Sequence, residues 1–72
     1  MKKFVYQVAD YEYVGSEAFG DAWRQARAKA TELHTAVYRL VIQNGQVKQD
    51  VFTRGGCFLP VTCAQSSCVM VF

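Results

Sequence analysis

Three cysteines and one histidine are the residues of this chain whose chemistry could support a metal site. Cys57, Cys63 and Cys68 lie within the last sixteen of the 72 residues, and His34 is the only histidine. Structural zinc sites usually take two of their four ligands from a CxxC pair, which the C-x5-C-x4-C spacing here does not provide. We therefore expect reduced, partly buried cysteines that behave as small apolar side chains, and no metal or other cofactor. A zinc ion held by these three cysteines and His34 is the alternative.

Two carboxylates near the N-terminus, Asp10 and Glu12, could act as a general acid and base because both would lie on one side of an extended strand. Nothing near them in the sequence supplies a nucleophile or a metal-binding set. His34 lacks a neighbour of the usual catalytic kind, and we interpret it as a cap at a helix C-terminus. The chain also has no glycine-rich phosphate loop, Ser-His-Asp set or HExxH motif. We expect a protein without enzymatic activity.

The remaining chemistry is that of a binding surface. The segment Asp10–Tyr13 places two tyrosines on one side of an extended strand, and tyrosine is enriched at protein interfaces. Arg24 and Arg27, three residues apart on a helix, could form a basic contact. The alternative is a plain strand end and a solvated helix surface. The expected protein-binding residues are Tyr11, Tyr13, Asp10, Glu12, Arg24, Arg27, Arg39 and Lys48.

An alanine-rich helix is expected to position the arginines. A serine that can cap the first turn, followed by apolar residues at spacings of three and four, predicts a helix over residues 16–34. We expect Phe19, Trp23 and Leu33 to supply most of its buried area. Gly20 weakens the first turn, so the alternative is a regular helix that begins one residue after it.

A β-hairpin is predicted around Asn44-Gly45, because this dipeptide suits the positive φ angles of a type I′ turn. Its strands are expected over residues 36–43 and 46–54, paired outward from the turn so that Arg39 faces Asp50. Side chains alternate across a strand, so one face should be core and the other solvent. The expected core face holds Tyr38, Leu40, Ile42, Val47 and Val51, and the expected outer face holds Val37, Arg39, Lys48, Asp50 and Phe52.

A first strand over residues 3–14 and a tail over residues 55–72, with an edge strand at 68–72, complete the predicted fold. We expect a single α+β domain, with one amphipathic helix on a small antiparallel sheet in the order β-α-β-β. Hydrophobic residues make up 51% of the chain and charged residues only 19%, against a usual share of about 25%. This composition favours an exposed apolar patch, and hence a protein partner or a homodimer.

The distribution of charged and apolar residues indicates which classes of partner to expect and where in the cell the protein is found. The net charge of +2 is scattered along the chain, without the concentrated basic footprint of a nucleic-acid-binding domain. No apolar run reaches the length of about 18 residues that a membrane span needs. Gln7 and Asp10 interrupt the N-terminal apolar stretch, so it does not match a signal peptide. We expect a cytoplasmic protein, with nucleic acid and membrane disfavoured as partners.

The helix sequence over residues 22–30, the strand over residues 36–42 and the Asn44-Gly45 turn together resemble small accessory proteins of bacteriophages and prophages. Among these, the chain is most similar to anti-CRISPR inhibitors of type I surveillance complexes. The resemblance covers residues 4–54, consists of a pattern of elements and leaves out the cysteine-bearing tail. It implies a helix on a small antiparallel sheet.

The same resemblance implies a non-enzymatic inhibitor in the host cytoplasm. Such a protein occupies a nucleic-acid-binding or recruitment surface on a bacterial protein complex. No site residue is carried over, because the family shares no site motif. Two other interpretations compete with it. One is a small nucleic-acid-binding module that uses Arg24, Arg27, Lys29 and Lys48, and the other is a homo-oligomeric phage structural or regulatory protein joined through Val37, Phe52 and the apolar C-terminal residues.

Overall fold

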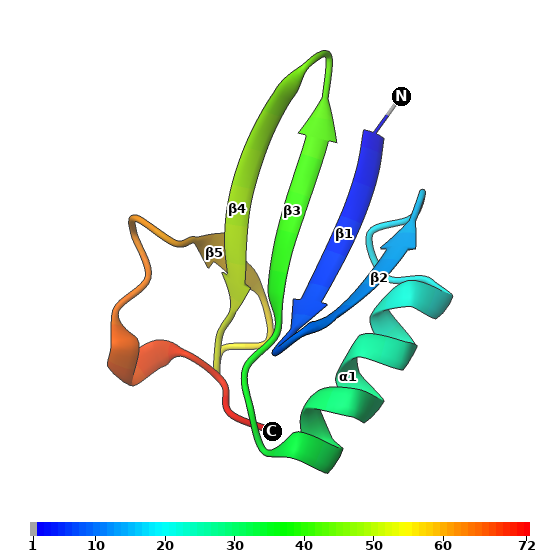
Figure 1. The fold of residues 1–72 in the computed structure, drawn as a ribbon. Helices are drawn as coiled ribbons and strands as arrows, with labels where there is room; N and C mark the ends of the chain where they lie inside the picture. The colour runs from blue at the N-terminus through cyan, green and yellow to red at the C-terminus, as the bar shows by residue number, and fades with distance from the viewer. Residues whose placement is uncertain (1) are drawn as a thin grey trace.

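The computed structural model describes residues 2–72, which form one α-helix packed on one face of a five-stranded antiparallel sheet (Figure 1). The elements in chain order are β1 (Lys2–Val8), β2 (Tyr11–Gly15), α1 (Asp21–Leu33), β3 (Tyr38–Gln43), β4 (Gln46–Phe52), β5 (Phe58–Pro60) and the short 3-10 helix η1 (Ser66–Cys68). The strands lie in the order β2-β1-β3-β4-β5. The expected α+β class, with one helix on an antiparallel sheet, is confirmed.

Two strands replace the single strand that was predicted over residues 3–14. The chain reverses at Ala9-Asp10, and β2 pairs antiparallel with β1. Ala9 takes a left-handed backbone conformation with φ of 51°, which is uncommon for alanine. The turn was missed because no glycine or Asn-Gly pair marks it.

The C-terminal tail also differs from the prediction. Residues 68–72 are all described and form no strand; a single bridge joins Val69 to Thr53. The sheet instead ends at β5, whose three residues pair with the end of β4. The strand and helix order is therefore ββαβββ. The predicted hairpin strands over residues 36–43 and 46–54 are correspondingly shorter, as β3 and β4.

Helix α1 begins at Asp21, directly after Gly20, as the alternative interpretation held. The predicted start at Ser16 is wrong, because the chain from Ser16 to Gly20 forms bends and turns. At the other end, His34 has φ of 53°, and its backbone N–H donates to the carbonyl oxygens of Ala30 and Thr31. His34 thus caps the helix through its backbone, which satisfies carbonyl groups that would otherwise lack a donor.

Small side chains allow α1 to lie close to the sheet. Ala22, Ala26 and Ala30 are buried against β1. A Cβ atom added to Gly15 in β2 would lie 3.0 Å from the Cβ of Ala22, closer than nearly all real contacts. The helix therefore lies so close to β2 at this point that glycine is the residue that fits there, and it covers the β1–β2 side of the sheet (Figure 1). The side chains that it covers on β1 are Phe4, Tyr6 and Val8.

Trp23 is the one large residue of α1 that joins the core as predicted. Its ring lies 4.8 Å from the ring of Phe52 and 5.4 Å from that of Phe58, between ring centres. The expectation for the other two is wrong, because Phe19 is 56% exposed and Leu33 is 42% exposed. Trp23 thereby links the helix to the far strands β4 and β5, which α1 itself does not cover.

The predicted register of the β3–β4 hairpin is confirmed residue by residue, with Arg39 opposite Asp50 around the Asn44-Gly45 turn. The predicted assignment of its faces is wrong. Val37 and Phe52 pack on the helix side, in or against the core cluster. Strand β1 pairs with β3 so that Tyr6, which faces the helix, lies beside Arg39. The residues expected in the core, Tyr38, Leu40, Ile42, Val47 and Val51, therefore point to the face of the sheet that carries no helix. Of these, Val51 is nevertheless buried, as expected.

Candidate protein-interaction surface

The ion pair between Arg39 and Asp50 lies on the helix side of the sheet. Nη2 of Arg39 donates to Oδ2 of Asp50 at 3.1 Å, and the two side chains are 14% and 13% exposed. The guanidinium carbon lies 4.0 Å from the ring centre of Phe58, a cation–π contact. The predicted exposure of this pair is wrong. Arg39 therefore has little surface to offer a partner and acts as a structural residue.

Tyr6 lies beside this pair, and its side chain is fully buried. Its hydroxyl oxygen has no hydrogen-bond partner in the described protein. Burial raises the pKa of the Tyr6 phenol above its ordinary value of about 10, and the positive charge of Arg39 offsets part of this rise. The raised pKa means that the folded state holds the phenolic proton more tightly than the unfolded chain does.

Replacing Tyr6 with phenylalanine should therefore change the pH dependence of stability more than the stability at neutral pH. In the native protein, the contribution of the neutral Tyr6 phenol to the free energy of unfolding is fully present below about pH 10. It is lost as the pH rises through the pKa of Tyr6 in the folded state, because Tyr6 ionises at a lower pH in the unfolded chain than in the folded protein. We expect Tyr6→Phe to remove this alkaline loss and to shift the free energy of unfolding at pH 7 by no more than about 1 kcal/mol. Urea denaturation between neutral and alkaline pH measures both, with Tyr11→Phe as the exposed control. An unchanged alkaline slope in Tyr6→Phe would contradict the assignment.

The predicted contact residues of the first hairpin lie on different surfaces. Asp10 is exposed in the turn, and Glu12 faces the side without the helix, where it accepts a hydrogen bond from Gln7 at 3.1 Å. Tyr11 is 48% exposed on the helix side, with the ammonium of Lys29 4.7 Å from its ring centre. Tyr13 is half-buried against the core. Asp10 and Glu12 therefore do not form the acid–base pair that an extended strand would have given.

The predicted basic contact residues are also spread out. Arg24 and Arg27 lie on the outer surface of α1, and Arg24 pairs with Asp21 at 3.6 Å in an exposed contact. Lys48 is exposed on the helix side of β4, near Lys2 and the hairpin turn. The structure therefore does not bring the eight predicted contact residues together into one site.

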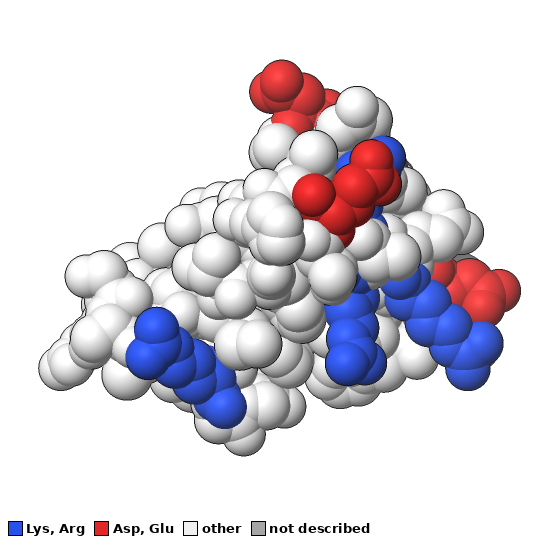
Figure 2. Space-filling model, turned by 90° about the horizontal axis from the view of Figure 1, so that it is seen from below, with Lys and Arg blue, Asp and Glu red and all other residues white. Residues whose placement is uncertain are grey.

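Charged residues are scattered over the end of the molecule seen in Figure 2. Individual Lys and Arg side chains lie apart or beside Asp and Glu, with broad uncharged areas between them. A surface of this kind gives no continuous track for a phosphate backbone.

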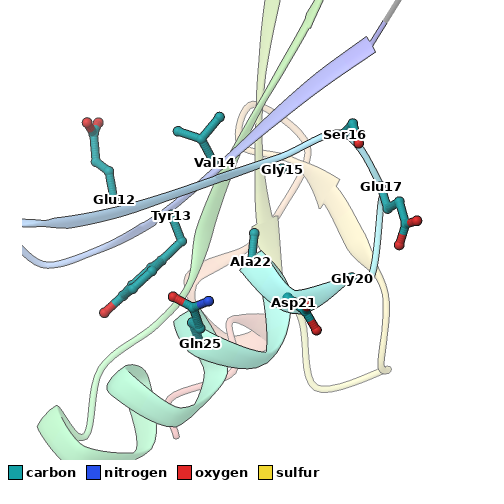
Figure 3. A pocket seen from close by; sticks show the side chains of 10 residues that line it. All are labelled: Glu12, Tyr13, Val14, Gly15, Ser16, Glu17, Gly20, Asp21, Ala22 and Gln25. Carbon is teal, nitrogen blue, oxygen red and sulfur yellow. The ribbon is translucent and has the colours of Figure 1, made fainter.

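An open pocket of about 450 Å³ lies between β2 and the first turn of α1. Figure 3 shows Tyr13 and Gln25 on one side of it and the loop with Ser16 and Glu17 on the other. The carboxylates of Glu12, Glu17 and Asp21 point in different directions. The pocket thus has no convergent set of polar groups of the kind that fixes a small ligand or a metal.

The face of the sheet opposite α1 is the most distinctive surface of the molecule. We call it the open sheet surface; its residues are Val5, Val14, Tyr38, Leu40, Ile42, Val47, Val51 and Leu59. Val47 is 59% exposed and Val14 is 58% exposed, while Val5 and Val51 are buried by their neighbours. The surface spans all five strands, and contiguous apolar patches of this kind are typical of binding sites.

Five of the eight residues of this surface were expected in the core from the sequence, although one sequence signal pointed to the surface. On β1 itself, the face without the helix carries Val5 between Lys3 and Gln7. The clearer signal is the β3–β4 hairpin, whose two faces both carry large apolar residues such as Leu40 and Phe52. Strands that are apolar on both faces usually have a covering layer on each side. Within residues 2–72 the helix provides only one of these layers.

Comparison with known proteins gives no relative for this chain. No protein-family model, no curated protein and no solved structure matches it. Within residues 2–72, no three His, Cys, Asp or Glu side chains are grouped so that they could hold a metal ion, and the three cysteines are exposed rather than partly buried. In the same residues no helix has the length and apolarity needed to span a membrane. The open sheet surface is therefore the feature on which a functional proposal can rest.

Proposed function

We propose that this chain is a non-enzymatic protein-binding domain and that it binds protein through the open sheet surface. The observation that carries the proposal is the apolar character of this surface across all five strands. Within residues 2–72, α1 packs on the opposite face and no other helix covers this one. Burying apolar area contributes about 25 cal/mol per Å². A protein partner that covers Leu40, Ile42 and Val47 would gain this energy without breaking any contact inside the domain.

The resemblance of residues 4–54 to phage proteins suggests a finer proposal. The domain would act as an inhibitor of a bacterial defence complex, such as a type I CRISPR surveillance complex, by occupying a nucleic-acid-binding or recruitment surface in the host cytoplasm. Of the predicted contact residues, those exposed away from the open sheet surface could reach such a target. They are Asp10, Tyr11, Arg24, Arg27 and Lys48.

Charge placed on the open sheet surface should weaken the protein association that is made through this surface. Crosslinking of a tagged chain in a bacterial host, followed by nuclease treatment, measures association with any protein, including a second copy of the chain. We expect Leu40→Asp and Val47→Asp to lower the crosslinked fraction at least about tenfold, because a charge at an apolar interface must be desolvated. Val47 is 59% exposed, so its substitution should leave the fold intact even if Leu40→Asp does not.

The matched control is Gln46→Asp, which adds the same charge to the neighbouring residue of β4 but on the helix side. It should crosslink like the native chain. Unchanged association in a folded Val47→Asp variant would overturn the proposal. A nuclease-resistant multisubunit complex among the crosslinked species would identify an inhibitor target, whereas recovery of nucleic acid alone would favour the binding-module interpretation.

A further inference from the structure

The open sheet surface and its borders form a grid whose rows follow the strand register. The first row runs Lys3, Ile42, Val47; the second runs Val14, Val5, Leu40, Gln49; the third runs Glu12, Gln7, Tyr38, Val51, Leu59. Leu40 lies at the centre of this grid, in the middle strand and the middle row. Polar residues lie at its borders, apart from Gln7. The positions in this grid show which residues would meet if two copies packed face to face about different two-fold axes.

The two charged residues of the grid lie at opposite ends of neighbouring strands. Lys3 is in the first row on β1, and Glu12 is in the third row on the edge strand β2. Gln7 donates a hydrogen bond to Glu12 at 3.1 Å, whereas the described structure gives Lys3 no ion-pair partner. Within one copy these charges are two rows apart. Across two copies their positions depend on the direction of the symmetry axis.

A two-fold axis that crosses the strands at the middle row brings the opposite charges together. This axis places the first row of one copy over the third row of the other. Each strand then lies over the same strand of the second copy, as a self-complementary interface requires. Lys3 then lies one strand away from Glu12 of the second copy. The lateral offset is about 4.8 Å and the separation of the sheets about 10 Å, which two long side chains can span.

The same axis also matches the apolar residues. Leu40 meets Leu40 of the second copy, and Ile42 meets its Tyr38. Val47 lies over the position of Val51, which is already buried within its own copy. An axis parallel to the strands would instead set Lys3 against Val47 and Glu12 against Leu59 of the second copy. That arrangement buries charge against apolar groups, which is costly without a partner. Charge complementarity thus selects the axis across the strands.

We infer that the occupant of the open sheet surface is a second copy of this chain, packed face to face about that axis with two symmetric Lys3–Glu12 ion pairs. This inference rests on the proposed protein-binding function and names its partner. Because α1 packs on the opposite face of each sheet (Figure 1), the dimer would have the two sheets inside and the two α1 helices outside. Arg24, Arg27 and Tyr11 stay exposed in duplicate, available to a larger target.

The dimer should be weak, because the grid is small. Four strands at about 4.8 Å and three rows about 7 Å apart cover roughly 400 Å² per copy, about half the usual share of a stable interface. We expect a dissociation constant in the micromolar range. Sedimentation equilibrium from about 10 μM to about 1 mM covers that range.

Charge reversal tests the pairing directly in this experiment. The native chain should approach twice its mass of 8.1 kDa at the highest concentration. We expect Lys3→Glu and Glu12→Lys each to weaken the dimer at least about tenfold, because two attractions become two repulsions. The double variant should restore the dissociation constant to within about threefold of the native value. Lys48→Glu, which makes the same change on the helix side, should have no effect.

Each other result overturns the inference. A native chain that stays monomeric throughout would exclude the second copy, and the protein-binding function would still stand if Val47→Asp loses a different crosslinked protein. A dimer that tolerates both single reversals would place the interface elsewhere. Single variants that weaken the dimer without rescue in the double variant would reject the paired two-fold geometry.

Discussion

Replacing Asp50 with alanine should destabilise the fold by about 3 kcal/mol, because it leaves the Arg39 guanidinium without its partner in a mostly buried position. The pair is held at 3.1 Å, and Phe58 covers the guanidinium. A domain of this size has a free energy of unfolding of only about 4–11 kcal/mol, so the loss would be a large part of the total. Urea denaturation followed by far-UV circular dichroism measures it.

The control for this prediction removes both charges at once. The double variant Arg39→Met with Asp50→Leu should lose much less stability than Asp50→Ala alone, because no uncompensated charge is left behind. A loss of less than about 1 kcal/mol in Asp50→Ala would show that water reaches the pair freely and that it behaves as a surface ion pair.

Replacing Trp23 with alanine should destabilise the fold by a similar amount, about 3 kcal/mol, because it empties the contact between α1 and the far strands. The indole packs on the rings of Tyr6, Phe52 and Phe58 at 4.8–5.7 Å between ring centres. Trp23 is the only tryptophan of the chain, so the transition must be followed by circular dichroism rather than fluorescence.

Leu33→Ala is the matched control on the same helix. Leu33 is 42% exposed, and its truncation should cost less than about 1 kcal/mol. An equal loss of unfolding free energy in Trp23→Ala and Leu33→Ala would mean that contacts along the whole helix stabilise its packing, and not mainly those of Trp23.

Local signals in the sequence were sufficient for the hairpin and the helix. Asn44 and Gly45 both have positive φ, as a type I′ turn requires, and the pairing from Gln43 to Tyr38 follows directly from that turn. His34 caps the C-terminus of α1, as predicted, and the helix starts after Gly20, which is the alternative to the predicted start at Ser16. These features depend on a few neighbouring residues, which is why sequence patterns captured them.

The faces of the hairpin could not be predicted in the same way. Alternation separates two sets of side chains but does not say which set meets the helix, and both sets here contain large apolar residues such as Leu40 and Phe52. Contacts between residues far apart in the sequence determine which face of the hairpin meets the helix. Tyr6 on β1 lies beside Arg39 on β3, and Phe58 on β5 covers the guanidinium.

The candidate site was missed for the same reason. The hairpin residues of this surface, among them Leu40, Ile42 and Val47, are expected in the core from the sequence, and the expected contact residues have charged or aromatic side chains. Arg39, one of these, is buried, while Val47, placed in the core, is among the most exposed apolar residues. Large apolar side chains on both faces of the hairpin, such as Leu40 and Phe52, are the one sequence signal for a second covering layer.

The most direct test of the open sheet surface is a dilution series of methyl NMR spectra, from about 1 mM to about 20 μM. If a second copy covers this surface, the methyl signals of Val14, Leu40 and Val47 should shift with concentration, because these groups lose a packed partner as the dimer dissociates. Signals of Ala28 and Thr31 on the outer surface of α1 should stay constant. Spectra that do not change with dilution, or shifts confined to α1, would contradict the assignment of the open sheet surface to a second copy.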